Sequence, residues 1–396
     1  MHARRSTAFG TLLLPTLLAL LLGGCGGGGT TINETGSSAG SVGGWHWDLP
    51  SNFPQPWVSE NNPMSEAKFQ LGRRLFYDTR LSGNGSKACA SCHLQKLAFT
   101  DGKAFSSGAT GQLTLRSAMP LANAVYHPTL TWGNPSLTSL EQQMEVPLFA
   151  TDPVEMGVND SNRETVLQRL RDDTDYVSRF KESFPQQSQP ITFENVIKSI
   201  ATFQRGILSG NSRFDRYQRG ETILTPAERR GLDLFNSEKA ECFHCHAGFN
   251  FNDQVVYTGL KFIEKPFHNT GLYNLGGTGA FPIPNRGVYE VTKNPTDMGA
   301  FRAQSLRNVA VTAPYMHDGS IATLEEVLDF YADGGRNITE GAYAGDGRYN
   351  PFKSELITLI DLNAQEKADI VAFLKTLTDD SLLTNPRYAN PFEAAQ

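Results

Sequence analysis

The sequence has little cysteine, no run of basic residues and few strand-like patterns. Its 396 residues include 5 cysteines, and a chain of this length can bury a core without disulfides. The chain has 35 Lys and Arg residues and 41 Asp and Glu residues, which gives a net charge of −6. An acidic chain without a basic cluster does not favour nucleic acid as a partner.

Four of the five cysteines lie in two copies of one short motif. Cys89 and Cys92 are followed by His93, and Cys242 and Cys245 are followed by His246. In an exported protein, this spacing lets two thiols add to the vinyl groups of a haem while the adjacent histidine ligates its iron. The sequence therefore predicts two covalently bound haem c groups.

Three other uses of these cysteines were weighed. Paired Cys-x-x-Cys motifs can bind zinc, a single pair can act as a redox dithiol, and cysteines can form a disulfide framework. The first two do not explain why both copies end in histidine. The third is not needed in a chain of this size.

The N-terminus resembles a lipoprotein signal, predicted at residues 1–24. Two arginines precede an apolar run at residues 12–22, which is too short to span a membrane, and residues 22–25 (LGGC) resemble a lipobox. We expect lipid on Cys25. The alternative is an ordinary signal peptide that happens to contain this cysteine.

Residues 25–44 are rich in Gly, Ser and Thr. Such a segment buries little apolar surface and is predicted to be a flexible tether between lipid and protein. Because haem attachment through this motif takes place outside the cytoplasm, we expect a lipid-anchored protein on the periplasmic side of a bacterial membrane, at the outer membrane.

A weak internal repeat predicts a mainly α fold of two tandem cytochrome c-like haem domains. Residues 72–76 (GRRLF) precede the first motif, and residues 231–235 (GLDLF) precede the second. The second helix has a capping box at 225–228 (TPAE). The boundary is expected near 209–221, which gives domains 45–215 and 216–396. Further helices are predicted at 162–184, 193–208, 323–332 and 364–377.

The sixth ligand of each iron decides between electron transfer and reaction with a substrate. After the first motif, residues 94–126 contain no histidine and Met119 is their only methionine. The loop at 105–111 (FSSGATG) offers no ordinary haem ligand. The first haem is therefore expected to be open on its distal side.

The chain resembles the bacterial di-haem cytochrome c peroxidase and MauG superfamily over nearly all of residues 60–380. The phrases that carry the resemblance are 71–78 (LGRRLFYD), 81–85 (LSGNG), 99–102 (FTDG), 152–157 (DPVEMG) and 305–319 (SLRNVAVTAPYMHDG). Segments 45–50 (WHWDLP) and 54–57 (PQPW), with the lipoprotein start, further resemble the MbnH branch, the partner of MbnP copper-binding proteins.

The resemblance implies roles around the first haem. His93 would be the proximal ligand of the catalytic haem and His246 that of the second. The distal histidine of classical peroxidases falls at Ala109 and is missing, as in MauG. The family's distal amide and carboxylate fall at Gln143 and Glu155, where they could relay a proton during peroxide cleavage. The alternatives are a surface amide and a turn carboxylate.

The resemblance also implies the ligand of the second haem and the residue between the haems. Tyr331 falls where MauG supplies a tyrosine ligand, with Met298 and Met316 as competitors. Read without the family, Tyr331 would be a packed aromatic on a helix. Trp132 matches the tryptophan between the two haems and would otherwise be a core residue.

Two further family features are altered. The carbonyls of Thr312 and Pro314 match calcium ligands, but Ser117 stands where the family has asparagine, which weakens a calcium site. Ala240 stands where MauG has the surface tryptophan that passes electrons from its protein substrate.

The sequence therefore predicts an enzyme that uses hydrogen peroxide to form a high-valent di-haem state. By the MbnH resemblance, that state would oxidise a tryptophan of an MbnP-like copper protein to kynurenine. The alternatives are a cytochrome c peroxidase that takes electrons from a small cytochrome c, and an electron carrier with two six-coordinate irons.

Overall fold

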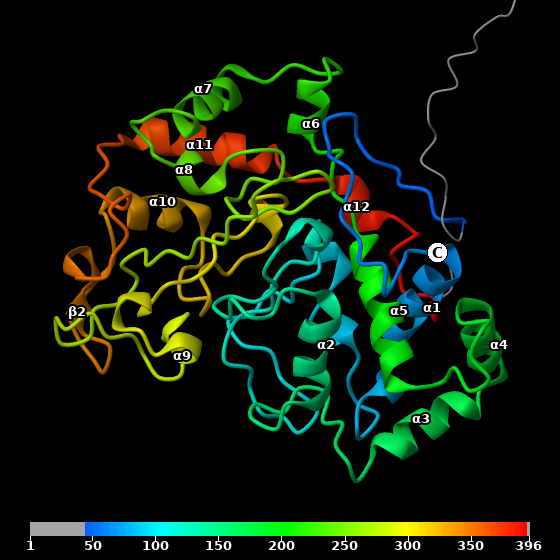
Figure 1. Ribbon diagram of the computed structural model, residues 1–396. Helices are drawn as coiled ribbons and strands as arrows, with labels where there is room; N and C mark the ends of the chain where they lie inside the picture. The colour runs from blue at the N-terminus through cyan, green and yellow to red at the C-terminus, as the bar shows by residue number, and fades with distance from the viewer. Residues whose placement is uncertain (1–43, 394–396) are drawn as a thin grey trace, which may run out of the picture. The chain divides into compact units, whose positions relative to one another are not determined.

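The computed structural model describes residues 44–393 (Figure 1). The expected signal peptide, Cys25 and nearly all of the tether lie outside the described residues. Among residues 44–393, no helix has the length and apolar character needed to cross a membrane.

The described chain is mainly α-helical, as predicted, and its strands are two residues long. The α-helices are α1 (Glu66–Tyr77), α2 (Leu140–Phe149), α3 (Arg163–Arg171), α4 (Thr174–Ser183), α5 (Phe193–Arg205), α6 (Arg213–Gln218), α7 (Pro226–Phe235), α8 (Phe243–His246), α9 (Tyr289–Thr292), α10 (Leu324–Ala332), α11 (Ala364–Lys375) and α12 (Asp380–Thr384). Strands β1 (Asn337–Ile338) and β2 (Gly345–Asp346) pair antiparallel. Short 3-10 helices include η3 (Cys89–Ser91), η5 (Ala124–Tyr126) and η7 (Val309–Val311).

The internal repeat corresponds to two helix crossings. Helix α1 packs on α5, and α7 packs on α11 (Figure 1). A Cβ added at Gly72 of α1 would lie 1.8 Å from the carbonyl oxygen of Ser199, and one at Gly231 of α7 would lie 1.9 Å from that of Asp369. Glycine at these two positions lets each helix pair approach closely.

Each crossing belongs to its own hydrophobic core. Phe76, at the end of the first repeat, is fully buried in a cluster with α4 and α5. Phe235, at the end of the second, is buried in a separate cluster with α11. The two halves therefore bury the same repeat position in separate cores.

Most predicted helix starts agree with the structure. Thr225 caps α7 and Thr323 caps α10, each through a capping box. The helix predicted at 162–184 is wrong, because two helices, α3 and α4, occupy this stretch. The Asp173 carboxylate accepts hydrogen bonds from the backbone N–H groups of Asp175 and Tyr176, which starts a new helix instead of continuing the first.

The C-terminal tail returns to the first half. The Tyr77 hydroxyl donates to the carbonyl oxygen of Tyr388 at 2.7 Å, and the Gln95 amide donates to that of Leu382 at 2.9 Å. Leu382 and Tyr388 are buried in the first core. The described residues form one compact unit, and the domain boundary near 209–221 stays a prediction.

A buried ion pair organises the second half. The Arg307 guanidinium lies 2.9 Å from the carboxylate of Asp215 on α6, and both side chains are buried. Arg307 Nε also donates to the carbonyl oxygen of Phe249 at 2.8 Å. This ties α6 to the segment that follows the second motif. The ion pair also holds the pKa of Asp215 below its usual value, against the effect of burial.

We predict that Gly231→Ala destabilises the protein by about 1–3 kcal/mol, because the added methyl group meets the backbone of α11. Asp233→Ala on the exposed face of the same helix is the control and should cost at most about 0.5 kcal/mol. Urea unfolding of the haem-loaded protein, followed by circular dichroism, measures both. Equal stabilities of the two variants would show that the crossing tolerates a larger residue.

Candidate functional site

The first motif is held by one hydrogen bond from its histidine. His93 Nδ1 lies 2.6 Å from the carbonyl oxygen of Phe99. A carbonyl can only accept, so Nδ1 carries the proton and Nε2 keeps a free lone pair. Burial lowers the pKa of His93 below its ordinary value. The ring is therefore neutral, the form that binds a metal ion.

The second motif repeats this arrangement. His246 Nδ1 lies 3.2 Å from the carbonyl oxygen of Phe251, and burial again lowers the pKa of the ring. Nε2 is again the free nitrogen. A metal-ligating histidine normally donates its other N–H to such a partner, which fixes the tautomer and the ring orientation.

Both accepting carbonyls come from strained turns. Phe99 has φ 66° and Phe251 has φ 51°, in the left-handed region that bulky residues rarely adopt. Such a conformation costs of order 1–3 kcal/mol and persists only where surrounding contacts hold it. Both phenylalanines are buried. The same strained turn thus positions the histidine in each half.

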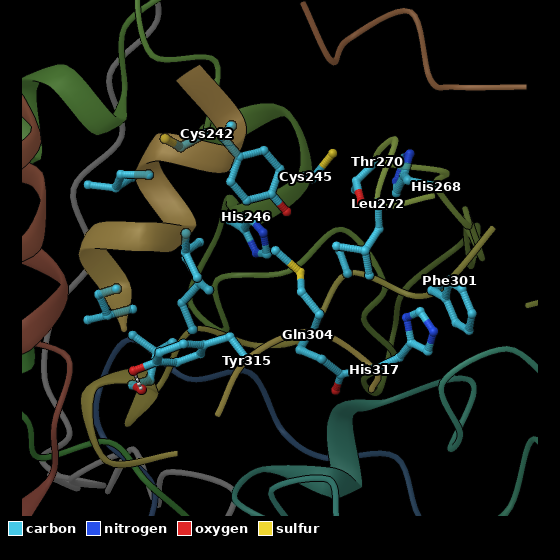
Figure 2. A pocket seen from close by; sticks show the side chains of 18 of the residues that line it. Cys242, Cys245, His246, His268, Thr270, Leu272, Phe301, Gln304, Tyr315 and His317 are labelled. Atoms are coloured by element: carbon cyan, nitrogen blue, oxygen red, sulfur yellow. Dashed lines mark hydrogen bonds between the residues drawn. The ribbon is translucent and has the colours of Figure 1, made fainter. Parts of the chain in front are cut away.

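Each motif opens into a cavity of its own. A cavity of about 370 Å³ is lined by Cys89, Cys92, His93, Trp132, Gln143 and Glu155. A second, of about 240 Å³, is lined by Cys242, Cys245, His246, Trp132, Thr312, Pro314 and Tyr331. Figure 2 shows His246 close to Cys242 and Cys245, with Phe301 and His317 on another wall of the second cavity.

These side chains fit two haem c groups. In each cavity, two unbridged thiols and a neutral histidine with one free nitrogen line the same space. Cys89, Cys92 and His93 would hold one haem, and Cys242, Cys245 and His246 the other. A zinc or disulfide role explains neither the cavities nor the orientation of the histidines.

The predicted distal residues lie at the first cavity. Gln143 projects from α2, and Glu155 follows that helix in a loop. Burial raises the pKa of Glu155 above its ordinary value. The backbone N–H of Ala109 donates to the carbonyl oxygen of Glu155 at 2.7 Å. This bond holds the loop at 105–111, which lacks the distal histidine, against the segment that contains Glu155. Met119, the one methionine of residues 94–126, also lines the cavity.

At the second cavity, the structure narrows the choice of predicted ligand. Tyr331 on α10 and Met316 both line the cavity, and Met298 does not. Burial raises the pKa of Tyr331 above its ordinary value. The phenol is neutral in the absence of a cation, and iron ligation by Tyr331 stays a prediction.

Trp132 lines both cavities. Its indole N–H donates to the carbonyl oxygen of Ser117 at 3.0 Å, and its ring meets the edge of His317 at 6.5 Å between centroids. It borders both spaces, as expected for a residue between two haems.

The calcium expectation gains no support. The Ser117 hydroxyl donates toward the carbonyl oxygens of Met316 and His317, at 3.2 and 3.4 Å. No hydrogen bond joins it to Thr312 or Pro314 within residues 44–393, and calcium stays a prediction. Ala240 is buried.

Sequence reasoning missed several polar residues at these cavities, including two histidines, an arginine and a glutamine. His127 lines the first cavity, Gln304 and His317 line the second, and Arg302 lines both. His127 lies one residue beyond the histidine-free stretch that drew attention to the distal side. His317 stands inside a recognised phrase, and burial lowers its pKa to about 4. For Arg302 and Gln304 the sequence carried no signal.

Fold and site together define a mainly helical protein with two c-type haem cavities that share one tryptophan. The family profile described as di-haem cytochrome c peroxidase matches residues 66–223. Cytochrome-c peroxidase IdrP1 of Pseudomonas sp. strain SCT is 38% identical over 342 residues, which are 82% of this chain and 84% of that protein.

Two further comparisons cover most of the chain. Methylamine utilization protein MauG of Methylorubrum extorquens is 31% identical over 390 residues, which are 95% of this chain and 98% of that protein. A crystal structure of a MauG-like protein associated with microbial copper homeostasis is 56% identical, with a TM-score of 0.87, over 88% of this chain and 100% of that one. The chain belongs to the di-haem cytochrome c peroxidase and MauG family, and it is a haem-dependent oxidoreductase that acts with peroxide.

We predict that Glu155→Gln slows the reaction with peroxide about 10²–10⁴-fold, because an amide cannot accept the proton. In the native protein the rate should rise with pH through the raised pKa of Glu155, since the carboxylate is the active base. The variant should lose this rise. Stopped-flow absorbance after mixing with peroxide measures both. Glu145→Gln, exposed on α2 and outside the cavity lining, should match the native protein.

Proposed function

We propose that this protein uses hydrogen peroxide to oxidise a side chain of a partner protein. The side chain is a tryptophan of an MbnP-like copper protein, and the product is kynurenine. The observation that carries this proposal is the 56% identity, over 88% of the chain, to a MauG-like protein associated with microbial copper homeostasis.

When bound, the two haems supply the reduction of peroxide and store the oxidising equivalents. In this proposal, Glu155 takes a proton from one peroxide oxygen and returns it to the other, which then leaves as water. The Gln143 amide orients the peroxide by hydrogen bonding. Both side chains line the first cavity, and the raised pKa of Glu155 suits proton transfer in both directions.

Trp132 carries electrons between the two cavities. Its N–H group donates to a backbone carbonyl, which cannot take up the proton. Trp132 therefore passes an electron without losing its proton. Tyr331 would hold the second iron through its phenolate oxygen, and such an anionic oxygen would favour the more positive metal ion.

The overall reaction balances with two peroxides for each tryptophan. Conversion of the indole to formylkynurenine adds two oxygen atoms from water and releases four electrons and four protons. Two peroxides take these up and become four waters. Hydrolysis then releases formate and leaves kynurenine.

The proposal places this chemistry on the periplasmic side of a bacterial outer membrane, with lipid on Cys25. The lipobox-like residues 22–25 and the two haem-attachment motifs support it. A calcium ion held by the carbonyls of Thr312 and Pro314 belongs to the same proposal.

We predict that an MbnP-like partner incubated with the protein and peroxide gains the kynurenine modification at one tryptophan. Peptide mass spectrometry measures it. Tyr331→Phe removes the proposed phenolate ligand and should lower the yield at least about tenfold. Tyr343→Phe, at a half-exposed tyrosine outside both cavity linings, is the matched control and should keep the native yield.

A second function is favoured by the 38% identity to cytochrome-c peroxidase IdrP1. Fast peroxide-dependent oxidation of a reduced small cytochrome c, with the copper protein left unmodified, would support it over partner oxidation.

Electron paramagnetic resonance tests the third alternative, an electron carrier. Two low-spin ferric haems that do not respond to peroxide would mean that Met119 or another residue closes the first iron.

A further inference from the structure

Each half of the chain places an aspartate two residues after its strained phenylalanine. Asp101 follows Phe99, and Asp253 follows Phe251. Asp101 is 7% exposed, and the side chain of Asp253 is 13% exposed. The turn that orients the motif histidine therefore also brings a largely buried carboxylate into each half.

In the first half, the carboxylate is bound by neutral groups. The Ser106 hydroxyl donates to Asp101 at 2.7 Å, and the backbone N–H of Lys103 donates to it at 3.1 Å. Ser106 lines the first cavity together with Cys92. Because both donors are uncharged, neither offsets the negative charge of Asp101.

In the second half, the carboxylate pairs with a histidine. His268 Nε2 lies 2.5 Å from Asp253 Oδ2, and two backbone hydrogen bonds with Phe301 hold the His268 backbone in place. The hydrogen bond to Asp253 is the largest of the causes that raise the pKa of His268 to about 10. The ring is therefore cationic at neutral pH, and the pair has no net charge. The buried Arg302 cation also interacts with the charge of Asp253.

This ion pair lies at the second haem motif. A ring nitrogen of His268, a carboxylate oxygen of Asp253 and the Sγ atom of Cys245 lie within 4.8 Å of one another. His268 and Cys245 both line the second cavity (Figure 2). Three such groups could hold a metal ion, but the thiol of Cys245 belongs to the haem motif. The ion pair thus borders the sulfur through which the second haem is attached.

Each aspartate acts on the motif histidine of its own half. Burial lowers the pKa of His93, and the charge of Asp101 acts against this effect. Burial likewise lowers the pKa of His246, with the charge of Asp253 acting against it. His268 opposes Asp253 here, because its positive charge lowers the pKa of His246. The first histidine therefore has an anion near it, and the second has an ion pair.

A buried charge near a haem shifts the balance between ferrous and ferric iron, and an anion favours the more positive ferric state. We propose that Asp101 acts in this way on the haem attached through Cys92, and that the Asp253–His268 pair prevents the same effect on the haem attached through Cys245. This difference lowers the midpoint potential of the first haem relative to that of the second. The inference concerns the haem potentials and does not depend on the partner protein.

Amide variants separate charge from hydrogen bonding. His268→Gln keeps a side-chain donor for Asp253 and removes the positive charge. Asp101→Asn keeps an oxygen that can accept from Ser106 and removes the negative charge. The double variant His268→Gln/Asp253→Asn removes both charges of the pair. His46→Gln, at an exposed histidine, is the matched control. The haem content of every variant is checked first.

We predict that His268→Gln lowers one of the two midpoint potentials in a spectroelectrochemical titration of the haem-loaded protein, because Asp253 has lost its charged partner. We expect a tenfold change in the ferric–ferrous equilibrium, which is about 59 mV for a one-electron couple. The double variant should return to the native value, because its net charge at this position is again zero. Asp101→Asn should raise the other potential, and His46→Gln should leave both unchanged.

Two results would overturn the proposal. Unchanged potentials in His268→Gln would show that the charge of His268 does not reach the haem. A double variant whose potential stays as low as that of His268→Gln would show that lost packing, and not lost charge, causes the change. The proposal also fails if Asp101→Asn and His268→Gln shift the same potential, since the two charges belong to different haems.

Discussion

Each motif histidine must enter its cavity neutral and with one nitrogen free, and a single hydrogen bond to a backbone carbonyl meets both requirements. The bonds from His93 to Phe99 and from His246 to Phe251 fix the proton on Nδ1 and leave Nε2 for iron. Burial keeps both rings neutral, because it lowers their pKa. In each half, aromatic packing around the phenylalanine holds that carbonyl in place.

The helix crossings supply the rigidity that the strained turns need. Phe99 packs edge-on against Phe76 of α1, and Phe251 packs against Phe235 of α7. In each half, the helix that crosses through a glycine thus also contacts the strained phenylalanine. In the second half, Arg307 adds a bond to the carbonyl two residues before Phe251. Close helix packing and histidine orientation are therefore parts of one arrangement.

The sequence contained the features of the fold that depend on near neighbours in the chain. Haem motifs, capping boxes and the repeated glycine helix can be recognised within a few residues, and the structure has them as predicted. The helix break at Asp173 was not predicted, because the helical sequence pattern continues through this residue. His127, Arg302 and Gln304 could not be found this way, because their roles come from partners far away in the sequence, such as Asn250 for His127 and Thr129 for Arg302.

Within the described residues, several buried polar groups without a hydrogen-bond partner lie at the second cavity. Arg302 Nε, Gln304 Nε2 and His317 Nε2 are buried without partners, and all three residues line the second cavity. Each such group costs about 1–3 kcal/mol if nothing joins it. Together with two strained turns, they make the polypeptide alone less stable than its helix packing suggests. A haem in each cavity would offer its iron to the free Nε2 of His93 or His246, so the native arrangement of this region would depend on the cofactors.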